Sequence, residues 1–248
     1  MAYVIAIAGK GGTGKTSLAG LLVKLLKEKK LGSVLAVDAD PNSNLAEVLG
    51  IELKETIGTI LDRISRHPEM IPVGMAKDRF IEYQVQSAIQ ENDGFDLLTM
   101  GRPEGPGCYC YVNNVLRNLM AKLIRDYDYV IIDNEAGLEH FSRRTTRSAD
   151  ILLVISDATA VALRAAARIS LLAKELEIKT KRKFILINRF DRQIDRIKEL
   201  DLEYIGNIPL DRELAKLSIE GKSLLGLAND SISLTALRRI GDRIWRQN

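Results

Sequence analysis

Residues near the N-terminus have the types and spacing of a phosphate-binding loop. The stretch from Gly9 to Thr16 reads GKGGTGKT and fits the pattern G-x-x-x-x-G-K-[ST], between an apolar run and a helical pattern. Glycine lets backbone N–H groups approach phosphate oxygens closely, and the following helix directs its positive end toward them. We expect Lys15 to bind the β- and γ-phosphates of a nucleotide and the Thr16 hydroxyl to bind Mg²⁺. The predicted nucleotide-binding residues of this loop are Gly11, Gly12, Thr13, Gly14, Lys15, Thr16 and Ser17.

The only two cysteines of the chain, Cys108 and Cys110, are separated by a single residue. A disulfide across that spacing is strained and closes almost no loop, so we expect two thiols. In an extended segment residues i and i+2 face the same side, so both sulfurs can bind one metal ion, at roughly 2.3 Å for zinc. Two thiolates leave a tetrahedral site half filled, and the only histidines, His67 and His140, lie in other segments. Two chains on a two-fold axis supply four thiolates; the alternative is a pair of structural cysteines without a ligand.

Apolar, β-branched runs alternate with helical patterns along the chain, which predicts a parallel sheet covered by helices on both faces. We expect strands at residues 2–8, 33–37, 95–100, 128–133, 151–156 and 183–188, and a short strand or loop at 204–209. We expect helices at 14–31, at 44–66 in pieces broken near Gly50 and Gly58, at 77–91, 112–125 and 159–176, and two more near the C-terminus. The predicted fold class is therefore α/β, doubly wound, with a mostly parallel sheet. Residues 1–248 are expected to form one P-loop domain, because no linker or repeat interrupts them.

Polar residues stand at the ends of several expected strands. Asp38 and Asp40 close the second strand, Asp133 ends the run DYVIID, and Asn188 ends KFILIN. The carboxyl ends of parallel strands share one edge of the sheet, where ligands bind. We therefore expect these residues, the phosphate loop and the segment 101–110 to gather there. Asp and Asn at strand ends also cap turns and helices, so the pattern alone leaves their roles open.

The sequence KGGTGKT, which begins at Lys10, resembles the deviant Walker A motif of the MinD/ParA class of ATPases. The resemblance implies ATP-dependent dimerisation, in which Lys10 reaches across the homodimer to the nucleotide of the partner chain. Additional positive charge offsets phosphate repulsion when two ATP-bearing faces meet. The alternative is a Lys10 side chain that is simply solvated.

The same resemblance implies roles for the residues at the strand ends. Asp40 is expected to orient or activate the attacking water, and Asp38 to lie near the magnesium shell. Asp133 matches the Walker B position, which holds Mg²⁺ through water. Asn188 is expected to face the adenine base. The resemblance thus assigns catalytic roles to Lys10, Lys15 and Asp40.

The segments GRPEGPGCYC (101–110), DADPNSNL (38–45) and DNEAGLEH (133–140) sharpen the resemblance to the CooC-type ATPases. That family assists nickel insertion into carbon monoxide dehydrogenase and the related acetyl-CoA synthase complex. It carries nickel or zinc on a Cys-x-Cys pair from each subunit, a role that passes here to Cys108 and Cys110. The resemblance implies an ATP-hydrolysing metallochaperone that acts as a homodimer with a client nickel enzyme. It leaves open whether Ni²⁺ or Zn²⁺ is the resident metal.

Two other functions fit parts of the pattern. A MinD/ParA-type positioning ATPase, which acts on DNA or a membrane, shares the phosphate site but does not require the cysteine pair. A nucleotide-gated electron-transfer protein of the nitrogenase-reductase type needs two cysteines per chain on separate loops. Here both cysteines lie in one loop, which disfavours that alternative.

Composition limits the partners. The net charge of +3, from 36 Lys and Arg against 33 Asp and Glu, gives no global argument for nucleic acid. The apolar start, MAYVIAIAGKGG, lacks a basic leader and a cleavage site and fits a first strand. No stretch approaches the roughly 18 apolar residues of a membrane span, and we expect the amphipathic, basic C-terminal segment to pack as a helix on the domain. These features favour a soluble, cytoplasmic protein without nucleic acid or stable membrane association.

Overall fold

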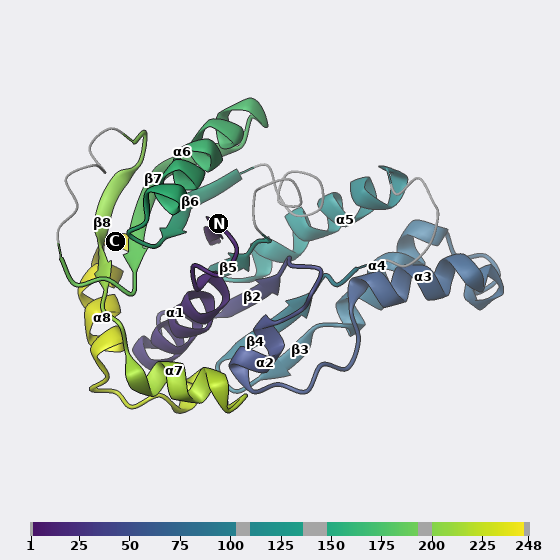
Figure 1. The fold of residues 1–248 in the computed structure, drawn as a ribbon. Coiled ribbons are helices and arrows are strands. Elements are labelled where there is room, and N and C mark those ends of the chain that lie inside the picture. The colour runs from purple at the N-terminus through teal and green to yellow at the C-terminus, as the bar shows by residue number, and fades with distance from the viewer. Residues whose placement is uncertain (1, 103–109, 136–147, 193–199, 246–248) are drawn as a thin grey trace.

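Strands form one eight-stranded sheet in the computed structural model, which describes residues 2–102, 110–135, 148–192 and 200–245, without the side chains of 110–116. The strands are β1 (Tyr3–Gly9), β2 (Val34–Asp38), β3 (Gln90–Asn92), β4 (Phe95–Thr99), β5 (Tyr129–Asp133), β6 (Ser148–Ser156), β7 (Lys179–Asn188) and β8 (Glu203–Ile208). Their order is β3-β4-β2-β5-β1-β6-β7-β8. The pair β3–β4 is antiparallel and the other neighbouring pairs are parallel. The predicted mostly parallel α/β sheet is confirmed (Figure 1).

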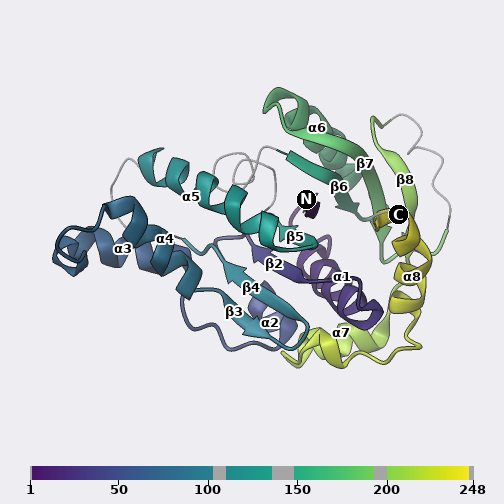
Figure 2. The ribbon, with the colours of Figure 1, turned by 180° about the vertical axis from the view of Figure 1, so that it is seen from behind.

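Helices cover both faces of the sheet (Figure 2). They are α1 (Lys15–Lys29), α2 (Leu45–Leu49), α3 (Ile57–Arg66), α4 (Lys77–Ser87), α5 (Cys110–Leu123), α6 (Ala160–Glu175), α7 (Arg212–Ile219) and α8 (Ile232–Ile244), with short 3₁₀ turns at Pro68–Met70, Ile124–Asp126 and Leu224–Gly226. Alternate residues of each strand face opposite layers. Ile5 and Ile7 of β1 pack in the core formed with α1, α2 and α8, whereas Ala6 and Ala8 pack in the core formed with α3 to α6.

Two expectations about local structure were wrong. Gly58 does not break a helix but lies in the first turn of α3, because Thr56 caps that helix and the Gly58 N–H donates to the Met100 carbonyl at 2.8 Å. The expected helix 77–91 ends at Ser87, and residues 90–92 form β3. The polar β3 pairs only with β4, an antiparallel edge contact. The break near Gly50 is confirmed, because Gly50 ends α2 in the left-handed conformation, with φ 72°.

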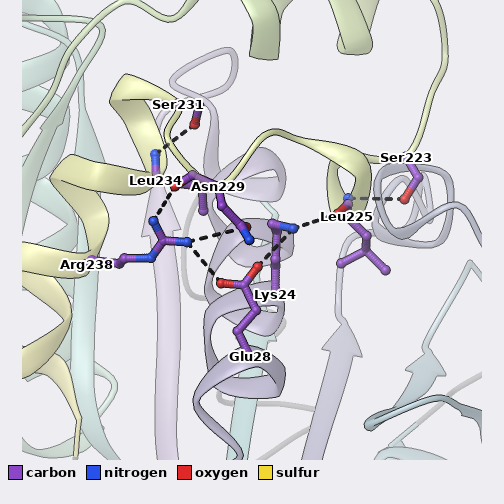
Figure 3. Close-up of polar contacts among 8 residues, drawn as sticks. All are labelled: Lys24, Glu28, Ser223, Leu225, Asn229, Ser231, Leu234 and Arg238. Atoms are coloured by element: carbon purple, nitrogen blue, oxygen red, sulfur yellow. Dashed lines mark hydrogen bonds and ion pairs between the residues drawn. The ribbon is translucent and has the colours of Figure 1, made fainter.

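The C-terminal segment is tied to α1, the helix that follows the phosphate loop (Figure 3). The Lys24 ammonium donates to the Leu225 carbonyl at 2.7 Å and pairs with Glu28 at 3.0 Å. Arg238 of α8 contacts Glu28 at 3.1 Å and also donates to the carbonyl of Asn229. The apolar face of α8 is buried against the sheet. The expectation that the C-terminal helix packs on the domain is therefore confirmed.

Helix length and polarity bear on membrane insertion. Among the described residues, every helix is too short or too polar to cross a bilayer.

Candidate functional site

The register of the central strands places polar residues in one row at the carboxyl edge of the sheet. Asp133 at the end of β5 pairs with Asp38 at the end of β2, and Asp38 pairs with Thr99 at the end of β4. On its other side Asp133 pairs with Ile7 of β1, two residues before the phosphate loop begins. The expected gathering of these strand ends at one edge is thus observed.

The phosphate loop folds around the carbonyl oxygen of Lys10. The Thr13 hydroxyl donates to that oxygen at 2.8 Å and the Thr13 N–H at 3.4 Å. The Lys15 ammonium also donates to it, at 3.4 Å. Gly14 then starts α1 in the left-handed conformation, with φ 90°, and no side chain caps the helix. The uncapped N–H groups at this helix start are the donors that a phosphate group requires.

Lys15 is buried, with 8% of its surface exposed. Burial lowers the pKa of its ammonium, while the nearby carboxylates of Asp133, Asp40 and Glu135 act in the opposite direction. A buried cation near the uncapped helix start provides strong electrostatic attraction for an anion, because little water screens it. Lys10, in contrast, has an exposed side chain.

Asp133 is a buried carboxylate, 1% exposed, and neither of its oxygens has a hydrogen-bond partner in the described part of the chain. Burial raises its pKa to about 6, although the nearby Thr16 hydroxyl and the Lys15 ammonium lower it. A buried carboxylate without a donor is costly unless a cation or ordered water satisfies it. Hydrated Mg²⁺ is held by such oxygen ligands, so Asp133 together with Thr16 fits a magnesium–nucleotide site.

Asp38 organises the segment that follows β2. One of its oxygens accepts the N–H of Asp40 at 3.1 Å, and the other accepts the N–H of Leu45 at 2.8 Å. Burial raises the pKa of Asp38 to about 7, with a further increase from the neighbouring Asp133. Asp40 is half-buried, and its carboxylate accepts both the backbone and the side-chain N–H of Asn42. Asp38 therefore helps to set the direction of Asp40.

Asn188 at the end of β7 contacts the phosphate loop directly. Its amide donates to the Thr13 carbonyl at 2.8 Å, and its side-chain oxygen accepts the N–H of Arg189. A Cβ at Gly14 would lie 2.4 Å from this amide nitrogen, so the position requires glycine for space as well as for its positive φ. The Arg189 guanidinium also donates to the Gly12 carbonyl at 3.4 Å. The sequence predicted Asn188 at the nucleotide site but not this contact with the loop backbone.

Two polar residues at this edge were not singled out as site residues, although Asn134 lies in the segment 133–140 that carries the family resemblance. Asn134, directly after β5, donates its amide to the Ile7 carbonyl at 2.8 Å, and its side-chain oxygen has no partner among the described residues. The Thr99 hydroxyl, 2% exposed, is also without a partner there. In the sequence, the only sign of a role for Asn134 and Thr99 is that each stands at the end of an apolar strand. Their burial and their lack of hydrogen-bond partners depend on contacts that the sequence does not specify.

Part of the predicted site lies outside the described residues. Cys108 is not described, and the side chain of Cys110 is not described either. Among the residues that are described, no group of three or more His, Cys, Asp or Glu could hold a metal ion. The predicted Ni²⁺ or Zn²⁺ site at the two cysteines therefore remains a prediction.

The phosphate loop, the buried lysine and the strand-end carboxylates define a nucleotide-binding protein of the P-loop class. Comparison with known families agrees: the family described as "CobQ/CobB/MinD/ParA nucleotide binding domain" matches residues 4–225. The chain belongs to this family, whose nucleotide-binding ATPase domain implies ATP or ADP with Mg²⁺.

Individual relatives span nearly the whole chain. An uncharacterized ATP-binding protein of Methanocaldococcus jannaschii is 43% identical, over 97% of this chain and 98% of its own length. The carbon monoxide dehydrogenase accessory protein CooC of Rhodospirillum rubrum is 31% identical, over 90% of each. Among solved structures, the septum site-determining protein MinD of Pyrococcus horikoshii with Mg-ADP superimposes with a TM-score of 0.74 at 22% identity, over 98% of this chain and 96% of that one. The similarity to the MinD structure supports the assignment of the fold alone.

Proposed function

We propose that this protein is an ATP-hydrolysing metallochaperone that assists nickel insertion into carbon monoxide dehydrogenase or the acetyl-CoA synthase complex. In this proposal two copies dimerise around nucleotide and around the Cys108-x-Cys110 pair. The similarity to the CooC accessory protein supports the client, and the cysteine spacing supports the cargo. Two thiolates from each chain would bind one nickel ion as cargo in the cytoplasm.

The observation that carries the proposal is the attachment of the cysteine segment to the nucleotide site. The Met100 N–H donates to the carbonyl of Asp38 at 2.8 Å, so the chain leaving β4 is bonded to the strand end that directs Asp40. Gly101 follows with φ 60°, and a Cβ there would lie 2.4 Å from the Thr56 hydroxyl. In this proposal a change at Asp38–Asp40 is passed through this bond to residues 100–101, where the segment that carries Cys108 begins.

The residues at the carboxyl edge have separable tasks in this proposal. Lys15 and the start of α1 bind the phosphates, and Thr16 and Asp133 would hold Mg²⁺, which supplies charge neutralisation on the β- and γ-phosphates. Asp40 orients the attacking water. The exposed side chain of Lys10 is free to reach the nucleotide of a second copy.

The first test is the metal content per chain of anaerobically purified protein, with its molar mass in solution. Wild type and Cys108→Ala/Cys110→Ala are each loaded with Ni²⁺ or Zn²⁺, with and without nucleotide. We expect about one metal per two chains in a dimer, and its loss in the double variant. Met70→Leu/Met75→Leu is a matched control, because it removes two partly exposed sulfur atoms elsewhere and should retain the metal.

The same experiment tests the link between nucleotide and metal. Equal metal affinity with ADP, with a non-hydrolysable ATP analogue and without nucleotide would disprove the coupling. Absence of bound metal, together with hydrolysis stimulated by DNA or liposomes, would favour the alternative, a MinD/ParA-type positioning ATPase. Cysteine thiols must lose their protons to bind a metal as thiolates, so metal affinity should fall as pH falls.

A further inference from the structure

A cleft of about 1060 Å³ opens at the amino edge of the sheet, opposite the phosphate loop. Its walls are formed by the starts of β1, β6 and β7, by the ends of α5 and α6 and by the turn Ile124–Asp126 that follows α5. The catalytic residues predicted at the carboxyl edge do not line it. The cleft is therefore separate from the nucleotide site.

The cleft combines an apolar floor with a basic rim. Buried side chains of Val4, Ala149 and Ile178 lie among its lining residues. The charged residues of the described lining are five cationic side chains and a single carboxylate, Asp150; the cations are Arg125, Lys174, Lys179, Lys181 and Lys183. The overall charge of only +3 does not account for this local excess.

Contacts within the protein already neutralise some of these cations. Lys181 pairs with one oxygen of Asp150 at 2.7 Å, and the other oxygen of Asp150 accepts the Val4 N–H at 2.8 Å. Lys174 and Lys183 share Asp201.

Two of the cations have no such partner. Arg125 and Lys179 are exposed, and neither forms an ion pair within the described part of the chain. The cleft therefore presents uncompensated positive charge beside an apolar surface.

We propose that this cleft binds an acidic, amphipathic segment of a partner protein. Carboxylates of the segment would face Arg125 and Lys179, and its apolar side chains would cover the floor. The volume lies just above the roughly 300–1,000 Å³ of small-molecule pockets, which suits a peptide better than a metabolite. The proposal does not depend on nickel transfer, and the cleft stays accessible if two copies meet through their phosphate-loop edges.

The lining fits a polypeptide better than a nucleic acid. Non-specific nucleic-acid binding uses phosphate contacts, with aromatic rings on which bases stack. The one aromatic side chain in the described lining, Tyr3, packs edge-on against Tyr129 with ring centroids 5.9 Å apart. An apolar floor has no counterpart in a phosphate backbone but matches the aliphatic side chains of a peptide.

The test uses the full-length protein and a fluorescently labelled peptide of about twelve residues that alternates pairs of Glu and Leu. Binding is followed by anisotropy at low and at physiological salt. Arg125→Glu/Lys179→Glu should weaken binding about tenfold or more at low salt, because two attractions become repulsions. Lys54→Glu/Lys77→Glu is the matched control: it changes the net charge equally at exposed sites outside the cleft and should change binding less than about twofold.

Three outcomes would overturn the proposal. Equal weakening by both variant pairs would show general charge attraction. Equal binding of a peptide with Gln in place of Glu would show that the carboxylates are not recognised. Tighter binding of duplex DNA, lost in the Arg125/Lys179 variant while the acidic peptide does not bind, would make this a nucleic-acid surface. Both variant pairs should hydrolyse ATP at the wild-type rate, so this test is independent of the metal measurement.

Discussion

At the carboxyl edge of the sheet Lys15, Asp38 and Asp133 are buried, whereas at the amino edge Arg125 and Lys179 are exposed. The buried groups have shifted pKa values, and neither oxygen of Asp133 has a partner among the described residues. The cations of the amino edge are solvated or paired with carboxylates. At the carboxyl edge, burial strengthens the electrostatic interaction of these groups with a small charged ligand. At the amino edge the cations are solvated, so their contacts with a partner should be weak and sensitive to salt.

The two edges should differ most in how the rate of ATP hydrolysis responds when one lysine is removed from each. Lys15→Met should lower ATP hydrolysis about a hundred- to a thousandfold, because a buried cation that contacts developing phosphate charge is lost. Lys183→Met, at the amino edge, should stay within about twofold of wild type. Phosphate release at saturating Mg-ATP measures both. Comparable losses in the two variants would mean that the edges do not differ in this way.

A pH titration of stability should show the cost of the buried carboxylates. Asp38 and Asp133 have pKa values raised to about 7 and about 6 in the folded protein, so the folded state binds protons more tightly than the unfolded state. Stability should therefore rise as pH falls from 8 to 6, by about 1–2 kcal/mol. Urea unfolding with a chelator and no nucleotide measures it.

Asp38→Asn is the matched variant for that titration and should remove most of the slope, because the higher of the two pKa values belongs to Asp38. Wild-type stability that instead rises from pH 6 to pH 8 would contradict the assignment of buried, protonatable carboxylates to this edge.

The smallest effect is expected within the amino edge itself. Asp150→Ala should cost about 1 kcal/mol, because it leaves the Val4 N–H without its acceptor. Lys181→Ala removes the other partner of Asp150, but the Lys181 side chain is 79% exposed, so the cost should stay below about 0.5 kcal/mol. Urea unfolding compares the two. A larger loss for Lys181→Ala would show that ion pairing at this edge is less screened than we infer.

Local patterns allowed most of the fold and the phosphate loop to be predicted. The loop from Gly9 to Thr16 is contiguous, so its spacing alone specifies the turn and the helix start. The parallel strands were recognisable because burial on both faces makes them apolar throughout. The strand β3 was missed because its residues, QEN, are polar and gain their conformation only from pairing with β4.

Contacts between distant segments could not be predicted in the same way. The amide of Asn188 reaches the Thr13 carbonyl across 175 residues, and the row of Thr99, Asp38 and Asp133 depends on strand register. The cleft at the amino edge combines residues from three strands and two helices. To predict which of these residues come together, one must know the order of the strands in the sheet. The periodicity of the sequence does not give that order.

The contacts of Lys24 and Glu28 have a consequence for synthesis of the chain. Lys24 and Leu225 are 201 residues apart, and Glu28 and Arg238 are 210 residues apart. A ribosome therefore releases the phosphate loop and α1 long before residues 224–244 can pack against them. During most of translation α1 lacks the partners that tie its C-terminal half to the C-terminal segment, so the helix behind the phosphate loop gains this support only at the end of synthesis.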